Sequence, residues 1–474
     1  LLFPKASGPA KRSALGGGGG AVQTPSAARQ RERLDARFRQ IADSFQTLHP
    51  TAVGTEPEQV IVFETVGDSV AGFAAAAARV PGLEWLAELD LDDRDPDDDF
   101  RDADDPARRL PQRLYAVMSS QHAMQQLLSL WGQWAADPGR RARHGFGPFK
   151  EVFTHLRDVR RWGPGDRLLE TGVLEDWEAN LTFGRDRVRF EVELWCRGDD
   201  AARRRAYAHL ERVVNAAGGR CVAQAAVPEI LYHGVLAELP AAALRDTVER
   251  IRRQEYTELL RCEEVMFFRP RAQAAFPVGE PAAGAMPGHR AGLPAAAGEP
   301  FVAVLDGLPL ENHEALRGRV RVDDPDDHAA RYAPRQQEHG TAMCSLVAHG
   351  DLNRDEPPLG RPVYVRPVLV PEEDFDGNVR EVTPDGVLLV DLFHRAVRRV
   401  LEGDGGAPAA APSVRVVNLS FGNTHQPFDR QFSPLARLLD WLAWKYRVLF
   451  LVSAGNQGRD ITIAAADTDW RALS

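Results

Sequence analysis

The sequence predicts an α/β chain in which an incomplete, doubly wound parallel sheet follows α+β modules. Three short apolar runs, at residues 301–307, 416–422 and 448–456, each end in polar residues and glycine. This is typical of buried parallel strands that reach the carboxyl edge of a sheet. Residues 338–350 carry the small and apolar side chains of a helix packed on such a sheet. In open α/β folds this edge is where ligands bind, so we expect the functional site there.

Size and composition restrict the class of protein. The 474 residues give room for two to four domains, and 44% hydrophobic and 27% charged residues are ordinary for a globular chain. The net charge of -10 argues against nucleic acid as the main ligand, because phosphate binding needs a concentrated basic face. The longest apolar runs fall far below the ~20 residues of a membrane span. We therefore expect a soluble protein with neither nucleic acid nor membrane as its partner.

The cysteines and the first residues predict a cytoplasmic protein. The four cysteines are widely scattered and show no CxxC spacing, which indicates reduced thiols rather than a disulfide framework or a zinc site. The opening segment has no apolar signal core. Residues 1–25 are rich in glycine and alanine and are predicted to be a disordered tail.

Residues 26–165 are predicted to form a helical or α+β amino-terminal module. Leu34, Phe38, Ile41 and Phe45 recur at helical spacing after a serine start signal. The elements expected after this first helix are a strand at 59–64, a helix at 69–79, a strand at 83–89 and helices at 111–137 and 147–161.

Residues 90–105 are rich in aspartate and interrupt this module. Blocks of like charge are usually solvated, so we interpret the stretch as a linker. A calcium loop is the alternative, although the stretch lacks the EF-hand order with its glycine and terminal glutamate.

Residues 187–270 show a different pattern, with strands and helices in the order β-α-β-β-α-β. This order predicts a ferredoxin-like sandwich of two helices on one antiparallel sheet. Residues 271–300 are rich in proline, alanine and glycine and are predicted to be an interdomain linker. The last module covers residues 301–474, and its sheet has not closed when the sequence stops.

Asp306 and His339 are the candidate catalytic residues. Asp306 ends a predicted strand and His339 opens a predicted helix, so the two can meet across one crevice. His313, His328 and His349 fit no metal-ligand spacing, and we expect neither a metal nor a cofactor. Cys344, inside the same helix, is interpreted as a small core residue rather than a nucleophile.

Four motifs resemble those of the subtilisin-like serine peptidases, the subtilase family. Residues 302–307 (VAVLDG) are similar to its acid motif, and residues 339–342 (HGTA) to its histidine motif. Residues 417–422 (VNLSFG) look like its substrate-pairing strand, and residues 453–456 (SAGN) match its oxyanion segment. The motifs occur in the family's order over about a third of the chain.

The resemblance implies a role for each matched residue in peptide hydrolysis. His339 is implied to be the general base and Asp306 the carboxylate that orients it. Asn456 is implied to donate a hydrogen bond to the oxyanion of the tetrahedral intermediate. The implied polypeptide substrate pairs in extended form with Ser420, Phe421 and Gly422.

The chain departs from the family at two points. Asp306 is followed directly by Gly307, without the family's intervening serine or threonine, so a hydrogen bond that orients the carboxylate is absent or replaced. The sequence also contains no Gly-Thr-Ser motif for the nucleophile, and Ser474 has no such context. We expect the nucleophilic serine to lie beyond this chain, and the chain alone to be inactive.

The resemblance also suggests partners and a rival function. The long front half and the stretch after His339 resemble bacterial subtilases encoded beside an AAA-type ATPase in phage-defence pairs, which implies an ATPase partner. The alternative function is a non-catalytic regulatory or binding protein on a peptidase fold. Because subtilase propeptides share the β-α-β-β-α-β order, the module at 187–270 is expected to cover the active-site cleft and restrain activity.

Overall fold

The computed structural model describes residues 22–45, 57–169, 171–272, 274–277, 295–352, 354, 356–373, 379–420, 422–423 and 433–453. The chain divides into two compact units. Of the described residues, the first contains those up to Arg167 together with Arg197–His209 and Arg261–Glu264, and the second contains the others. Within the described ranges, no helix is long and apolar enough to cross a lipid bilayer.

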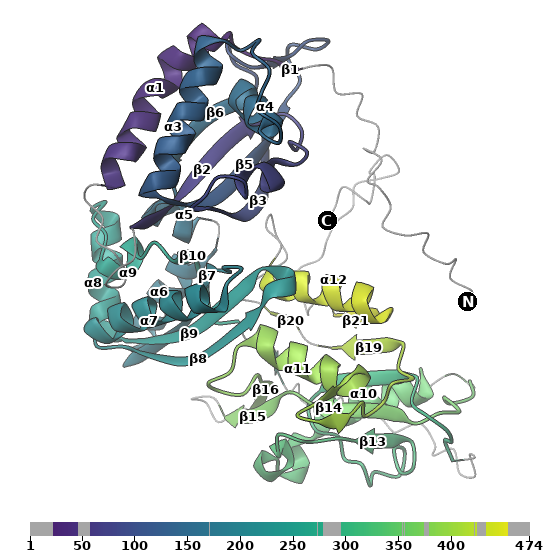
Figure 1. Ribbon diagram of the computed structural model, residues 1–474. Coiled ribbons are helices and arrows are strands. Elements are labelled where there is room, and N and C mark those ends of the chain that lie inside the picture. The colour runs from purple at the N-terminus through teal and green to yellow at the C-terminus, as the bar shows by residue number, and fades with distance from the viewer. Residues whose placement is uncertain are drawn as a thin grey trace. The chain divides into compact units, whose positions relative to one another are not determined.

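A four-stranded antiparallel sheet with the order β3-β5-β2-β6 forms the first unit's framework (Figure 1). Its strands are β2 (Glu58–Val66), β3 (Leu83–Arg94), β5 (Leu110–Ser120) and β6 (Leu156–Arg161). A separate ribbon pairs β1 (Val22–Gln23) with β4 (Arg101–Asp102). The helices along this part of the chain are α1 (Ala27–Ser44), α2 (Phe73–Ala77), α3 (Gln121–Ala136), α4 (Gly147–His155) and α5 (Pro164–Leu168).

Helix α1 forms where its cap and its apolar stripe predict it. The Ser26 side chain accepts a hydrogen bond from the Arg29 backbone N–H at 3.3 Å, which satisfies one of the unpaired donors of the first turn. Leu34, Phe38 and Ile41 lie on one face and are buried. The helix therefore contributes a continuous apolar face to the core of this unit.

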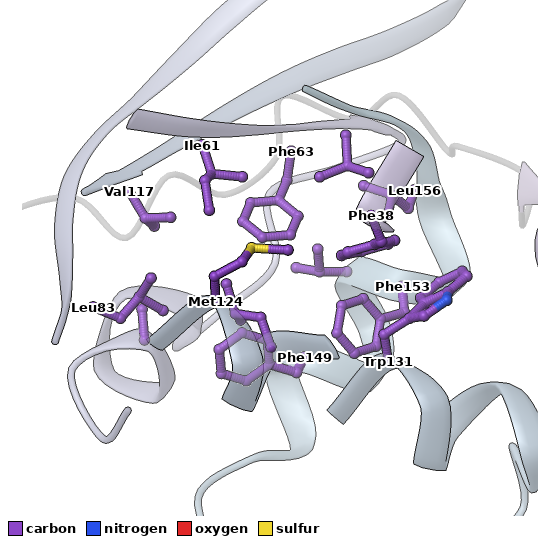
Figure 2. Packing of buried hydrophobic residues seen from close by; sticks show 14 of the residues in the cluster. Phe38, Ile61, Phe63, Leu83, Val117, Met124, Trp131, Phe149, Phe153 and Leu156 are labelled. Atoms are coloured by element: carbon purple, nitrogen blue, oxygen red, sulfur yellow. The ribbon is translucent and has the colours of Figure 1, made fainter. Parts of the chain in front are cut away.

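Aromatic side chains from α1, α3 and α4 meet in that core. Figure 2 shows Phe38, Trp131 and Phe153 packed together, and the rings of Phe38 and Trp131 stack with centroids 4.6 Å apart. Complete burial of such a side chain stabilises the fold by about 1.5–3 kcal/mol. The three helices are thus held on one face of the sheet by the same cluster.

The prediction of two uninterrupted helices at 111–137 and 147–161 is wrong. The chain from Leu110 to Ser120 is strand β5, and α3 begins only after Ser120, whose side chain caps it through the Ala123 N–H. Helix α4 ends at His155 and the chain continues as β6. Strand β5 pairs with both β2 and β3, so tertiary neighbours decide its conformation.

The prediction of a solvated linker at 90–105 is also wrong. Strand β3 continues to Arg94, and Asp90 lies opposite Arg113 of β5, with which it forms an ion pair. Asp97 and Asp102 each accept two backbone N–H groups from the residues that follow them, which stabilises tight turns. Arginine partners and turn geometry therefore accommodate the block of like charge.

In the second unit, one sheet is antiparallel with the order β10-β7-β9-β8. The elements of this segment are β7 (Arg187–Trp195), α7 (Asp200–Ala216), β8 (Arg220–Val227), η2 (Pro228–Ile230), β9 (Tyr232–Pro240), α8 (Ala241–Arg252), α9 (Glu258–Arg261) and β10 (Val265–Pro270). The preceding helix α6 (Val173–Thr182) places the buried Trp177 edge-on against Phe190 and Phe268 of this sheet.

The principal sheet of the second unit is five-stranded and fully parallel, with the order β13-β14-β12-β19-β21. Its strands are β12 (Val302–Asp306), β13 (Val320–Val322), β14 (Val363–Pro367), β19 (Val416–Leu419) and β21 (Leu449–Val452). From β12 the chain first builds one side of the sheet and then the other. Strand β12 therefore lies at the switch point, where open α/β sheets bind their ligands.

Helices cover both faces of this parallel sheet (Figure 1). They are α10 (Glu338–His349), α11 (Leu389–Leu401) and α12 (Pro434–Tyr446), with the short helices η3 (His328–Arg331) and η4 (Pro334–Gln336) in the loop before α10. On one face, Cys344 of α10 packs in a cluster with Val304. On the other, α11 and α12 pack in a cluster with Ala303 and Leu305. Alternate residues of β12 thus pack against the helices on opposite faces of the sheet, because side chains alternate in direction along a strand.

A third sheet has the order β15-β16-β11-β20 and includes part of the predicted linker. Its strands are β11 (Ala274–Pro277), β15 (Val370–Glu373), β16 (Val379–Val382) and β20 (Gly422–Asn423), and a ribbon of β17 (Gly403–Asp404) and β18 (Ala407–Pro408) lies nearby in sequence. Residues 274–277 of the predicted linker thus form a strand, residues 278–294 lie outside the described ranges, and the interdomain position of the segment stays a prediction. Backbone pairing on both sides makes β11 a strand, and composition carries no signal for that.

Candidate active site

Asp306 lies at the carboxyl end of β12, as the sequence predicts. It is the last residue of the strand and is fully buried. Its carbonyl accepts a hydrogen bond from the Val368 N–H at 2.8 Å, and its Oδ1 accepts one from the Gly307 N–H at 2.7 Å. These contacts fix the carboxylate at the edge of the parallel sheet.

The residues after His339 explain how the helix reaches this carboxylate. A Cβ atom at Gly340 would lie 2.4 Å from the carbonyl oxygen of Gly307, so only glycine permits the close approach. The Thr341 hydroxyl accepts a hydrogen bond from the Leu310 N–H at 2.8 Å. The first turn of α10 is therefore fastened to the segment that follows β12.

His339 and Asp306 are in direct contact. The imidazole Nδ1 lies 2.7 Å from Asp306 Oδ1, and the two side chains are 4% and 0% exposed. A carboxylate only accepts hydrogen bonds, so Nδ1 carries a proton and Nε2 is the atom that can take up another. Burial strengthens this bond, because water does not screen it.

Glu381 of β16 is a second carboxyl at the same imidazole, and the sequence did not predict it. Its Oε2 lies 3.9 Å from His339 Nδ1, its Oε1 lies 2.7 Å from the Tyr332 hydroxyl oxygen, and its side chain has no exposed surface. The one available signal in the sequence was Gly307, directly after Asp306. Because glycine has no side chain, the space beside the carboxylate was open to a side chain from elsewhere in the chain.

The surroundings of Glu381 favour its neutral form. Burial is the largest cause that raises the pKa of Glu381, to about 7, and the charge of Asp306 adds to it. The hydrogen bond from Tyr332 and the nearby His339 oppose this shift only in part. Near neutral pH the site therefore holds Glu381 in both its protonated and its ionised form.

The predicted substrate edge is only partly described. The Ser420 hydroxyl accepts a hydrogen bond from the Asn418 side chain at 2.6 Å, and Gly422 lies in β20, opposite Ala275 of β11. Phe421 and Asn456 lie outside the described residues, so their roles remain predictions. The edge predicted for substrate thus bears a strand of this same chain.

The remaining candidates are buried or hydrogen-bonded to backbone groups. Cys344 is fully buried, and burial raises the pKa of its thiol far above neutrality, which does not suit a nucleophile. His313 accepts the Ala315 N–H at its Nδ1, and His349 donates from Nε2 to the Ala315 carbonyl at 2.7 Å. His328 is buried, which lowers its pKa.

Two clusters among the described residues offer groups that could hold a metal. They are His209, Cys262 and Glu264 in the first unit, and Asp306, His339 and Glu381 in the second. The 2.7 Å separation in the Asp306–His339 pair is shorter than the ~3.4 Å between two ligands of a tetrahedral zinc. In the first cluster, Glu264 accepts hydrogen bonds from both of its neighbours. The first cluster and the Asp306–His339 pair of the second are therefore hydrogen-bonded, whereas Glu381 lies 3.9 Å from His339 Nδ1.

A buried carboxylate–imidazole pair at the switch point of a parallel sheet defines an α/β protein equipped for proton transfer. Residues 298–473 match the model of the Subtilase family, which supports a subtilisin-like peptidase domain in this part of the chain. No match to the chain was found among curated proteins.

Proposed function

We propose that this chain supplies the acid, the base and the substrate edge of a serine endopeptidase that works through an Asp-His-Ser triad. The observation that carries the proposal is the 2.7 Å contact between buried Asp306 and His339 at the carboxyl end of β12. The family match over residues 298–473 supports it.

In this mechanism the His339 imidazole takes the proton of a serine hydroxyl as that hydroxyl attacks the peptide carbonyl. It then passes the proton to the leaving amine. Asp306 holds the productive tautomer and stabilises the imidazolium. Asn456 is proposed to donate to the oxyanion, a contact worth about 3–4 kcal/mol of barrier. The nucleophile is proposed to follow in a Gly-Thr-Ser motif beyond Ser474.

The test is peptide hydrolysis by the protein made from the complete reading frame. We expect Asp306→Asn to lower kcat/KM by on the order of 10⁴-fold, because the imidazole loses its orienting partner. The matched control is His349→Gln, at the other end of α10, whose imidazole bonds the Ala315 carbonyl. This control is expected to leave the rate nearly unchanged.

Equal losses in both variants, or full activity of Asp306→Asn, would overturn the proposal. A folded complete protein that cleaves no peptide of a random library would favour the alternative, a non-catalytic regulatory or binding protein on a peptidase fold. Hydrolysis by the chain ending at Ser474 would contradict the proposed position of the nucleophile. The AAA-type ATPase partner remains a prediction, which co-purification from the native host would test.

We also propose that residues 187–277 restrain the peptidase domain by occupying its substrate edge. Strand β11 lies between β16 and β20, with Ala275 opposite both Val382 and Gly422. Extended substrates add to a sheet edge through the same main-chain bonds. A substrate would therefore need β11 to leave first.

The sheet that precedes β11 is anchored to helices of the peptidase domain. Tyr232 shares a buried apolar cluster with Phe393 of α11 and Leu438 of α12. Arg437 of α12 donates a hydrogen bond to the Ile230 carbonyl at 3.1 Å. The order β10-β7-β9-β8 supports a ferredoxin-like arrangement for this anchored module.

Two variants of the complete protein test the restraint. Deletion up to Pro300 removes module and strand together, whereas Ala275→Pro removes one backbone donor of β11 and leaves the apolar anchor intact. Both are expected to raise the initial rate of peptide hydrolysis, while the control Ala296→Pro, outside β11, leaves it unchanged. If neither variant raises the rate, the restraint is wrong.

A further inference from the structure

Gly307 and Glu381 share one space beside the catalytic acid. A Cβ atom at position 307 would lie 1.8 Å from Glu381 Oε1 and 2.6 Å from its Cδ. Glu381 reaches this place from β16, the strand that also pairs with β11. Its carboxyl therefore occupies the position that a side chain after Asp306 would take.

A count of protons at Tyr332 favours a neutral Glu381. The Tyr332 hydroxyl oxygen lies 3.0 Å from the Leu369 carbonyl oxygen and 2.7 Å from Glu381 Oε1. The carbonyl can only accept, and the hydroxyl carries a single proton. Tyr332 can donate its proton to an ionised Glu381, which leaves the Leu369 carbonyl without a donor, or to Leu369 while a protonated Glu381 donates to the hydroxyl oxygen. Only the protonated carboxyl satisfies both bonds.

The charged and titratable groups that face Glu381 come from three segments. They are Asp306 of β12, Glu338 and His339 of α10, and Tyr332 after η3. Two of them are acids, so ionisation of Glu381 adds negative charge beside existing negative charge, which the hydrogen bond from Tyr332 and the nearby His339 offset only in part. Burial together with these acids raises the pKa of Glu381 to about 7, within the range where a histidine base works.

We propose that Glu381 is a positioning residue of the peptidase site. Its carboxyl lies in the space beside Gly307, bonds to Tyr332 and holds the Asp306–His339 pair in place. Ionisation of this carboxyl changes the charge beside the His339 imidazole. The inference rests on the proposed function. Glu381 acts through Asp306 and His339 and takes the place of the side chain that the family carries after its acid.

A double-mutant cycle in the complete protein tests the shared space. Gly307→Ser inserts a side chain where Glu381 lies and is expected to lower kcat/KM by about 100-fold, since a displacement of about 1 Å has that effect. Glu381→Ala is expected to lower it by about tenfold through the lost Tyr332 bond. The double variant is expected to exceed the activity of Gly307→Ser by at least about tenfold. A double variant no better than Gly307→Ser would overturn the inference.

The ionisation is tested with Glu381→Gln, which keeps the shape but does not titrate. The profile of kcat/KM against pH should lose one inflection near pH 7 in this variant. Glu191→Gln is the matched control, because Glu191 also bonds a buried tyrosine, Tyr232, at 2.7 Å and has its pKa raised, chiefly by burial, to about 7. An unchanged profile in Glu381→Gln, or the same change in both variants, would count against the inference.

Two measurements on the chain ending at Ser474 separate this inference from the proposed function. Infrared spectra at pH 6 should show a protonated-carboxyl band that Glu381→Gln removes. The melting temperature should fall in Gly307→Ser and recover in the double variant with Glu381→Ala. If both results hold while no complete protein hydrolyses peptide, the proposed function fails and the shared space stands. A missing band together with no thermal recovery refutes the role of Glu381 whatever the activity.

Discussion

Glu193 and Glu381 are both glutamates of the second unit without exposed side-chain surface, yet their pKa values move in opposite directions. Burial is the largest cause at both positions and favours the neutral acid. At Glu193 two arginines, Arg437 and Arg269, outweigh burial and lower the pKa. At Glu381 the neighbouring acid Asp306 acts with burial and the pKa rises to about 7. The partners that the fold supplies therefore decide whether a buried acid is charged.

The two glutamates also differ in what their charge can do. Glu193 accepts a hydrogen bond from Arg269 Nε at 2.8 Å and forms an ion pair with Arg437, which ties β7 to β10 and to α12. Such a fixed ion pair does not titrate near neutral pH. Glu381 does titrate there, and groups with shifted pKa values of this kind are characteristic of functional sites.

The largest expected effect on stability comes from removing the cationic partners of Glu193, so that it becomes a buried acid without arginines, as Glu381 is. Replacing Arg269 and Arg437 by methionine leaves a buried carboxylate without its cations. The free energy of unfolding at pH 7 should fall by about 3–5 kcal/mol. Urea unfolding, or hydrogen exchange of the β7 amides, measures the loss.

The loss in that variant should shrink at acidic pH, because a protonated Glu193 needs no cation. Adding Glu193→Gln should recover part of it at pH 7. A variant that loses nothing at pH 7 would show that the ion pairs do not hold Glu193 in its charged form.

The second prediction concerns the sign of the pH dependence at Glu381. Its pKa is about 7 when folded and 4.5 ordinarily, so between these values the folded state keeps a proton that the unfolded chain has lost. Stability therefore falls as pH rises through this window, by about 3 kcal/mol. Glu381→Gln should be more stable than the parent at pH 8 and no more stable at pH 4. Thermal unfolding at both pH values measures the difference, and equal shifts at both would contradict it.

The third prediction concerns Glu238 of β9, whose contribution to stability depends on pH with the opposite sign to that of Glu381. Arg187, Arg189 and Arg220 hold it at 2.6, 2.8 and 3.0 Å, and despite burial they lower its pKa to about 2. Its stabilisation is present above pH 4.5 and is lost as pH falls toward 2. Because the guanidinium groups are 24–60% exposed, we expect Glu238→Gln to cost only about 1 kcal/mol at pH 7. A chemical denaturation series from pH 7 to pH 2 should show this cost vanish.

The smallest effect is expected at Ser433, a helix cap that carries no charge and therefore serves as a reference for the charged positions. Ser433 caps α12 by accepting the Ala436 N–H at 3.2 Å and is buried. Ser433→Ala should lower the free energy of unfolding by about 1 kcal/mol. The loss should be the same at pH 4 and pH 8, since no titrating group is removed. A pH-dependent loss would indicate that the cap is coupled to a charged neighbour.

The elements that could be predicted are those whose signals are local. The apolar runs before Asp306 and after Val416 read as strands because every residue of a buried parallel strand faces a helix layer. Helix α10 could be predicted from its small residues, and Gly340 shows why, since a larger residue there would meet the backbone at Gly307.

The predictions that failed depend on distant partners. Residues 110–120 have helix-like spacing and become β5, because β2 and β3 flank them on both sides. Strand β11 has no side-chain pattern at all and exists through its pairing with β16 and β20. Neither of these strand pairings can be recognised from the local pattern of apolar and polar residues, because the partner strands lie far away in the sequence.

The same division holds at the site. The sequence by itself determined that an acid at a strand end and a histidine at a helix start would share the carboxyl edge of one sheet, because each motif fixes its own local geometry. Only the tertiary structure decided that Glu381 would join them and that β11 would pair with β20, beside the edge predicted for substrate. Both depend on segments brought together by strand pairing and burial, and these forces act between residues that have no fixed spacing in sequence.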